Sequence, residues 1–291
     1  MAGIFSKLKQ AYKLYQQVDM DKLAKLSAKV DLKEVMDKFA GMDDAQLKGL
    51  MKMMSSGGKP KKELPEINGD FYELHMRLSP EDRAIQLRVR EFMEREIQPI
   101  VNNFWLHDEF PYEIIPKFAE LGLCGVTYQG YECPGLSFLM EGIIAMEMAR
   151  VDSSIATFFG VQSGLSMGSI YMCGSEAQKQ EWLPAMHRME KIGAFGLTEP
   201  EVGSGAAGGL TTTVKRVGDT WVLNGQKKWI GNATFADVII IWARDVDDGE
   251  VKGFIVRKDT PGFEVEKIKG KMALRIVQNG LITLTNCAIP E

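Results

Sequence analysis

The stretch that decides the fold is residues 191–244, KIGAFGLTEPEVGSGAAGGLTTTVKRVGDTWVLNGQKKWIGNATFADVIIIWAR. Within it, an apolar run opens at Thr198 into a polar loop that is rich in glycine, and KKWIGN (227–232) ends a predicted strand. Glycine lets the backbone approach a ligand closely, and Trp229 offers a large rigid face beside it. Taken alone, these features fit either a ligand-holding loop or an ordinary surface connection.

The composition is ordinary for a globular protein. The chain has 291 residues, of which 45% are hydrophobic and 25% are charged. Residues 1–62 carry 13 lysines and 7 acidic residues, a balance of +6, so the rest of this −4 chain carries −10. An acidic body gives no reason to expect nucleic-acid binding. We recognise no apolar run of transmembrane length and no signal peptide.

The cysteines and histidines are scattered along the chain. Four cysteines and three histidines show neither metal-ligand spacing nor a disulfide framework, so we expect no metal site. Reduced, mostly buried thiols are typical of proteins in a reducing compartment. We therefore expect a cytoplasmic protein.

The first part of the chain is predicted to be separate from the rest. Residues 1–54 form a predicted amphipathic helical extension rich in lysine and methionine. Basic amphipathic helices bind anionic membranes, but acidic residues interrupt the lysines here. Packing on the protein's own body or on a neighbouring subunit is therefore favoured over membrane contact. Residues 55–77, which include SSGGKPKK, are a predicted linker.

Residues 78–191 are predicted to form an all-helical domain. Ser79 is a capping residue, Pro80 occupies the first helical position, and acidic residues fill the first turn, so a helix begins there. The other predicted helix boundaries are Gly122, Ser137, Asp152 or Ser153, and a capping box at 175–178.

Residues 192–291 change to short strands separated by turn signals such as Asn224-Gly225. We expect strands at 193–198, 211–217, 220–229, 238–244, 253–257, 263–267 and 281–286. Short strands at this spacing indicate an antiparallel sandwich or barrel. The predicted fold class is therefore α+β, an all-helical domain followed by an antiparallel β-barrel or sandwich domain.

The loop and the strand end together resemble the signature segments of the acyl-CoA dehydrogenase family, which includes glutaryl-CoA dehydrogenases and plant-type short-chain acyl-CoA oxidases. The matching motifs are Thr198-Glu-Pro, Gly203-Ser204, NGQKKWIGN at 224–232 and Ala236-Asp237, in the family's order and spacing. The similarity extends from about Leu78 to Glu291. The family's C-terminal four-helix bundle is absent from this sequence, so the resemblance implies a truncated or split coding sequence.

The resemblance implies that the loop and the strand end hold FAD. Backbone groups near Leu197 and the hydroxyl of Thr198 would bind the pyrimidine edge of the flavin, and Trp229 would cover the face away from the substrate. The implied cofactor-binding residues are Phe195, Gly196, Leu197, Thr198, Gly203, Ser204, Trp229, Ile230 and Gly231. Ser204 is also the implied contact of the CoA substrate. The alternatives are a strand-end turn for Thr198 and an ordinary core aromatic for Trp229.

By the same resemblance, the function is FAD-dependent α,β-dehydrogenation of an acyl-CoA to the trans-2-enoyl-CoA. The implied electron acceptor is an electron-transfer flavoprotein or, in an acyl-CoA oxidase, O2. Homo-oligomers are usual in the family. The family's catalytic glutamate lies in the bundle, so we expect no catalytic residue in this chain. A non-catalytic flavin- or acyl-CoA-binding module is the alternative from another class.

Several positions depart from the family pattern. Gly231 stands where many dehydrogenases have a threonine, although the short-chain oxidases also have glycine there, and Gly205 replaces a usual aspartate. Ala156 aligns with the arginine that binds the distal carboxylate in glutaryl-CoA dehydrogenases. Because an unpaired carboxylate is costly in an apolar pocket, we expect an uncharged acyl chain. Glu199 and Glu201 are interpreted as loop acids rather than as an acid–base pair.

Overall fold

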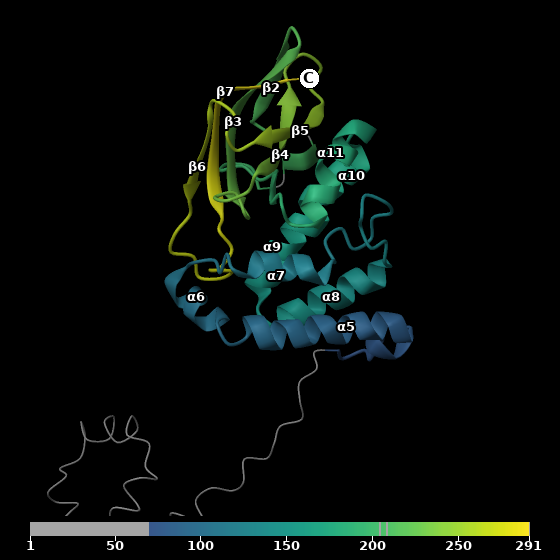
Figure 1. Cartoon of the computed structure of the whole chain (residues 1–291). Helices are drawn as coiled ribbons and strands as arrows, with labels where there is room; N and C mark the ends of the chain where they lie inside the picture. The colour runs from purple at the N-terminus through teal and green to yellow at the C-terminus, as the bar shows by residue number, and fades with distance from the viewer. Residues whose placement is uncertain (1–69, 204, 208, 291) are drawn as a thin grey trace, which may run out of the picture. The chain divides into compact units, whose positions relative to one another are not determined.

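The computed structural model describes residues 70–203, 205–207 and 209–290, drawn in colour in Figure 1. The predicted extension at 1–54, most of the predicted linker and Ser204 lie outside these residues. Within them, a helical part comes first and a sheet follows. The predicted order, helical domain and then β domain, is therefore confirmed.

The predicted capping residues begin or end helices in the structure, although other helices have boundaries that were not predicted. Ser79 Oγ accepts a hydrogen bond from the amide of Asp82, and Gly122 ends a helix with φ of 61°. Ser175 and Gln178 form the predicted capping box. The helices are η1 (Leu74–Arg77), α5 (Pro80–Phe92), η2 (Met93–Ile97), α6 (Val101–His107), α7 (Ile114–Leu121), α8 (Phe138–Val151), α9 (Ser153–Gly160), η3 (Val161–Ser166), α10 (Met167–Cys173) and α11 (Glu176–His187).

Two of these segments, η2 and η3, are π-helical, which the sequence did not predict. Single π turns are frequent at functional sites. The η3 segment is fastened to the start of the sheet by the buried side chain of Gln162. Its Nε2 donates to the carbonyls of Met186 and Lys191 at 3.0 and 2.9 Å, and its Oε1 accepts from the amide of Gly193 at 2.6 Å. The helical part and the sheet are thus joined directly behind η3.

The sheet is mixed. Its strands are β1 (Gly193–Gly196), β2 (Thr213–Val217), β3 (Thr220–Ile230), β4 (Val238–Asp245), β5 (Val251–Arg257), β6 (Phe263–Lys267) and β7 (Gly280–Pro290), in the order β1-β4-β2-β3-β7-β6 with β5 on β4. The expectation of a purely antiparallel sheet was wrong in one respect, because β1 and β2 both run parallel to β4. Turn signals predict hairpins, whereas a parallel pair needs a long crossover.

The strand β4 joins the two hydrophobic cores. Val238 and Ile240 face the helical core, whereas Ile239 and Ile241 belong to the core enclosed by the curled sheet. Successive side chains of a strand point to opposite faces, and a strand buried on both faces reads as a continuous apolar run. This explains the sequence VIIIWA at the start of β4.

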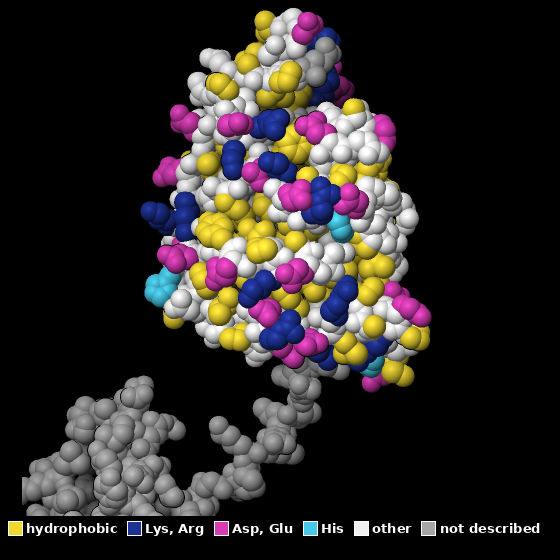
Figure 2. All heavy atoms as spheres, viewed as in Figure 1, with side chains coloured by type: hydrophobic (Ala, Val, Ile, Leu, Met, Phe, Trp, Pro, Cys, Tyr) yellow, Lys and Arg dark blue, Asp and Glu magenta, His cyan; other side chains and the backbone are white. Residues whose placement is uncertain are grey.

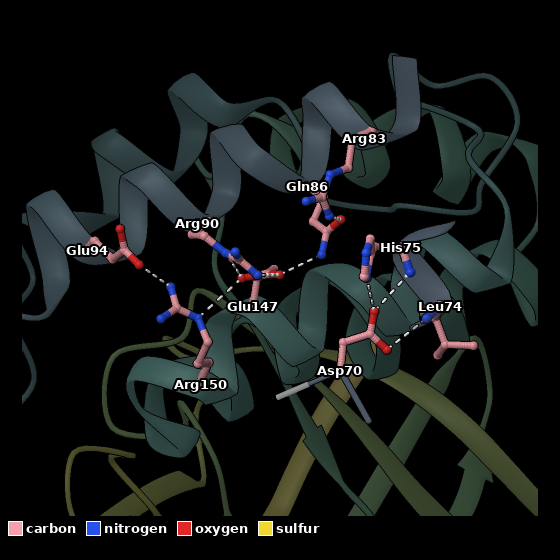
Figure 3. A network of polar contacts seen from close by, with 9 residues as sticks. All are labelled: Asp70, Leu74, His75, Arg83, Gln86, Arg90, Glu94, Glu147 and Arg150. Atoms are coloured by element: carbon pink, nitrogen blue, oxygen red, sulfur yellow. Dashed lines mark hydrogen bonds and ion pairs between the residues drawn. The ribbon is translucent and has the colours of Figure 1, made fainter. Parts of the chain in front are cut away.

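The helices α5 and α8 are joined by a buried carboxylate, Glu147, drawn in Figure 3. It accepts hydrogen bonds from Gln86 Nε2 at 2.7 Å, from Arg90 Nη2 at 2.8 Å and from Arg150 Nε at 3.4 Å. Burial alone would raise the pKa of Glu147, but these donors outweigh burial and lower it. Glu147 therefore stays ionised and ties the two helices together.

On the face shown in Figure 2, acidic and basic side chains are interspersed with apolar ones. Within residues 70–290 as far as they are described, no helix is long and apolar enough to cross a membrane. The four cysteines are free thiols, and Cys124 and Cys287 are buried.

Candidate functional site

A cavity of about 630 Å³ lies where the ends of β1 and β3 meet η3. Its size falls within the usual range of small-molecule and cofactor sites. Four segments line it: Thr157 in α9 with Val161 and Leu165 in η3, then Phe195, Leu197 and Thr198 at the end of β1, then Trp229, Ile230 and Gly231 at the end of β3, and finally 271–274 with Asn279 between β6 and β7.

Trp229 stands out in this lining because its backbone is strained and its side chain is half exposed. Its φ is 64° and its exposed fraction is 51%. The pairing of β3 with β7 shifts register between Lys227 and Ile230, and such bulges re-aim side chains. Asn279 Nδ2 holds the strained turn by donating to the carbonyl of Trp229 at 2.8 Å. Trp229 is therefore not an ordinary core aromatic.

Strain of this kind costs on the order of 1–3 kcal/mol and persists only where the surroundings over-determine it. Asn232, three residues further on, has a φ of 63° and is 1% exposed. Its Nδ2 donates to the carbonyls of Phe158 and Gly193 at 3.4 and 3.3 Å. The segment that presents Trp229 is thus fixed at both ends, by Asn279 and by Asn232.

The loop after β1 is fixed by a buried ion pair. Lys227 Nζ lies 2.8 Å from Glu199 Oε1, and both side chains are 0% exposed. The carboxylate also accepts from the amides of Thr211 and Thr212 at 2.6 and 2.8 Å. The interpretation of Glu199 as a loop acid missed this burial, whereas Glu201 is exposed as a loop acid should be.

Thr198 contributes open polar groups to the cavity. Its carbonyl accepts from the amide of Lys228 at 2.8 Å. Its own amide and hydroxyl have no hydrogen-bond partner among the described residues. These two groups are therefore available to a ligand in the cavity.

The one charged side chain of the described cavity lining is held by hydrogen bonds to the protein. Among its described residues, Lys271 is the one charged side chain. Its ammonium donates to the carbonyl of Leu274 at 2.8 Å, to Asn279 Oδ1 at 2.7 Å and to the carbonyl of Val277. Burial lowers the pKa of Lys271. This lysine braces the loop between β6 and β7, and the rest of the described lining is uncharged.

The structure brings together six of the nine predicted cofactor-binding residues: Phe195, Leu197, Thr198, Trp229, Ile230 and Gly231. Gly196 pairs with Ile241 inside the sheet and does not line the cavity. Gly203 lies in an exposed turn, and Ser204 lies outside the described residues.

The sequence interpretation missed the cavity-lining residues that lie far from Thr198 and Trp229 in the sequence. These are Thr157, Val161 and Leu165 from the helices, and Lys271, Met272, Leu274 and Asn279 from the later loop. Helical periodicity explains their apolar types but carries no signal that they share one cavity. Ala156, which the sequence comparison singled out, packs against the helical core, and its neighbour Thr157 is the residue at the cavity.

Comparison with known proteins identifies this architecture. The model of the acyl-CoA dehydrogenase N-terminal domain matches residues 79–190, and that of the middle domain matches residues 194–287. The chain belongs to the acyl-CoA dehydrogenase family.

Individual relatives agree with this assignment. The chain is 31% identical over 231 residues to the mitochondrial short-chain specific acyl-CoA dehydrogenase of Mus musculus, covering 76% of this chain and 56% of the relative. A glutaryl-CoA dehydrogenase from Mycobacterium smegmatis in complex with FADH2 is 39% identical with a TM-score of 0.72, over 75% of this chain and 56% of that one. An acyl-CoA dehydrogenase from Bacillus anthracis, complexed with FAD, is 30% identical with a TM-score of 0.68, over 74% and 37%. The chain thus spans about half the length of the curated relatives it matches.

Within this acyl-CoA dehydrogenase framework, the cavity fits a flat ring system with one polar edge. Trp229 offers a broad aromatic face, Leu197 and Ile230 are apolar, and Thr198 has an unpaired amide and hydroxyl. A Cβ atom on Gly231 would lie 3.2 Å from Val161 Cγ2 and 3.4 Å from Val277 Cγ1. Glycine at this position therefore keeps the space between β3 and η3 open.

A second cavity of about 590 Å³ also borders η3, at Gly164 and Leu165. It shares Leu165 and Phe195 with the first cavity, and its lining is also largely apolar. Glu141 is the one carboxylate among its described lining residues, whereas the first cavity has none. The two cavities thus both border η3.

Proposed function

We propose that this chain forms the FAD-binding and part of the acyl-CoA-binding region of an acyl-CoA dehydrogenase. The reaction is the α,β-dehydrogenation of an acyl-CoA to the trans-2-enoyl-CoA, with an electron-transfer flavoprotein or O2 as the acceptor. FAD would supply the redox chemistry by accepting the β-hydrogen as a hydride. Membership of the family and the fit of the cavity to a flat, polar-edged ring support the proposal.

The observation that carries the proposal is that Trp229 and Thr198 line the same cavity. Trp229, which is half exposed and strained, would cover one face of the flavin, and the open amide and hydroxyl of Thr198 would bind its pyrimidine edge. Donors fixed in advance stabilise charge without reorganisation. The chain itself thus binds, orients and covers the ring.

The proposed substrate carries an uncharged acyl chain. Val161 and Leu165 offer apolar walls, and the ammonium of Lys271 is already satisfied by three oxygen atoms. A second carboxylate on the substrate would therefore meet a lining whose one described cation already donates to protein oxygen atoms, and burying a carboxylate without its own donor is costly. No carboxylate lines the first cavity among those residues either. The base for the α-proton is accordingly proposed to come from elsewhere.

An FAD titration of Trp229→Ala, with Trp229→Phe as the matched control, tests this function. The alanine variant loses a face worth about 1–3 kcal/mol of stacking, so we expect FAD binding about 5- to 150-fold weaker than in the wild type. Phe retains an aromatic face, and its loss should stay within about threefold. Flavin fluorescence quenching gives both values. Equal affinity of all three proteins would contradict the assignment of the site.

The substrate class is tested by adding butyryl-CoA or glutaryl-CoA to the FAD-loaded protein under anaerobic conditions. We expect binding of butyryl-CoA to shift the flavin absorption spectrum at concentrations at which glutaryl-CoA causes no shift. A spectral change with glutaryl-CoA at concentrations at which butyryl-CoA causes none would contradict the proposal of an uncharged acyl chain.

An acyl-CoA oxidase is the second candidate, and Gly231 favours it. Glycine supplies no hydroxyl at this position, and its nearest side chains are the apolar Val161 and Val277. Oxygen consumption with peroxide release during turnover distinguishes the oxidase from a dehydrogenase. Binding of FAD and acyl-CoA without turnover in either assay would instead support the binding-module alternative.

A cytoplasmic location and a homo-oligomeric state complete the proposal. Free, partly buried thiols support a reducing compartment. The oligomeric state follows only from what is usual in the family. Cell fractionation tests the location, and light scattering of the purified protein tests the oligomeric state.

A further inference from the structure

The peptide group that joins Leu197 to Thr198 separates the cavity from a buried charge. Lys227 Nζ donates to the carbonyl of Leu197 at 3.0 Å and to Glu199 Oε1 at 2.8 Å. The side chain of Lys227 is 0% exposed. A full positive charge is thus held one peptide group behind a residue of the cavity wall.

The peptide group between Leu197 and Thr198 has its carbonyl on the side of Lys227 and its N–H on the opposite side. In a planar trans peptide, the C=O and the N–H point in opposite directions. Because the carbonyl of Leu197 points at Lys227, the amide of Thr198 points away from the ion pair. This amide has no partner among the described residues.

The carboxylate of the ion pair, Glu199, accepts its other hydrogen bonds from residues outside the Leu197–Thr198 peptide. The carboxylate of Glu199 accepts from the amide and the hydroxyl of Thr211, both at 2.6 Å, and from the amide of Thr212 at 2.8 Å. Its negative charge is therefore spread over donors that precede β2. The pair presents its positive end to the Leu197–Thr198 peptide.

We propose that Lys227 is a positioning residue that polarises the Leu197–Thr198 peptide, so that the amide of Thr198 binds reduced FAD more tightly than oxidised FAD. This inference rests on the FAD site proposed above. Reduction adds negative charge at the pyrimidine edge, and a hydrogen bond to a charged acceptor is stronger than one to a neutral acceptor. Chains of hydrogen bonds polarise one another, and a buried chain is screened weakly.

The test compares the affinities of the 291-residue chain for oxidised FAD and for FAD reduced anaerobically with dithionite. For Lys227→Met we expect about tenfold weaker binding of reduced FAD and less than about threefold weaker binding of oxidised FAD. A tenfold change in the ratio of the two affinities corresponds to a fall of about 30 mV in the two-electron potential. A merely structural role would weaken both affinities equally.

Two further variants keep the result interpretable. Lys227→Met leaves Glu199 buried without its cation, so the double variant K227M/E199Q removes both charges and should fold while showing the same change in the ratio. Lys258→Met removes a surface ion pair with Asp237, 3.1 Å long, and should change neither affinity.

The possible failures can be told apart. If the wild-type chain binds neither form of FAD, the proposed function falls and the role of Lys227 falls with it. If the wild type binds both forms and the double variant keeps the wild-type ratio, the FAD site stands and only the role of Lys227 is overturned.

Discussion

Glu199 is ionised in the protein interior because its hydrogen-bond donors outweigh its burial. Burial alone would raise its pKa, but hydrogen bonds from Lys227, Thr211 and Thr212 hold the pKa at about 2, below the ordinary value of 4.5. A carboxyl group whose pKa is lowered by folding stabilises the fold at pH values above its ordinary pKa. That contribution is lost as the pH falls from about 4.5 toward about 2.

The variant Glu199→Gln should therefore be destabilised in a pH-dependent way. At pH 7 we expect the free energy of unfolding to fall by about 3–5 kcal/mol, because Lys227 is left as an unpaired buried charge. The difference between wild type and variant should narrow as the pH is lowered below about 4.5. Urea unfolding at several pH values measures it. A difference that does not vary with pH would contradict the account, and the exposed Glu201→Gln serves as the unaffected control.

From the sequence, the residues around Trp229 could be recognised as part of a site, but their backbone conformation could not be predicted. The motif around Trp229 was legible, because resemblance depends on local residue order. Its positive φ was not, because it depends on a bulge against β7 and on Asn279, 50 residues later in the chain. The burial of Glu199 was missed for the same reason, since its cation lies 28 residues away.

At the scale of elements, η3 contributes lining residues to both cavities. Tyr128 Oη donates to the carbonyls of Ser163 and Gly164, at 3.0 and 3.1 Å. The carbonyls of a π turn need such partners because their helical pairing is altered. A Cβ atom on Gly168 would lie 2.7 Å from the same hydroxyl, so glycine is required for the close approach. Tyr128 thus fixes the turn that carries Leu165.

Removing this hydroxyl should loosen η3. For Tyr128→Phe we expect a loss of about 1–2 kcal/mol in the free energy of unfolding and faster amide exchange within 161–166. Tyr131→Phe is the matched control, because the hydroxyl of Tyr131 binds only the exposed Glu176. For Tyr131→Phe, the loss in the free energy of unfolding should stay below about 0.5 kcal/mol. Similar behaviour of the two variants would mean that Tyr128 does not hold the π turn.

Helix ends were predictable and π turns were not. The caps at Ser79 and Ser175 depend on residues three positions away, which the sequence displays directly. The π turn depends on Tyr128, 35 residues before its partner Ser163. Strand positions were likewise legible from turn signals, but the parallel pairing of β1 with β4 was not.

Across the whole described molecule, the helical part and the sheet share one wall of the first cavity. The loop between β6 and β7 lines that cavity and reaches the end of α6. There, Arg275 donates to the carbonyls of Trp105 and Leu106 at 2.9 and 3.1 Å, and Gln278 Nε2 donates to the carbonyl of Asp108 at 3.3 Å. The last carbonyls of a helix lack partners within the helix, so residues of the loop between β6 and β7 supply donors to the end of α6.

The variant Arg275→Ala should make the loop between β6 and β7, which lines the first cavity, more mobile. It removes two charge-assisted hydrogen bonds to α6, a third to the carbonyl of Lys271 at 3.2 Å, and a cation–π contact in which the guanidinium carbon lies 4.9 Å from the centre of the Trp105 ring. We expect a loss of about 1–3 kcal/mol in the free energy of unfolding, with faster amide exchange in 268–279. Arg188→Ala is the matched control, because Arg188 pairs with the exposed Glu132 and Glu190 and should cost less than about 1 kcal/mol. If exchange in 268–279 stayed at the wild-type rate in Arg275→Ala, the contacts with α6 would not be what holds the cavity wall in place.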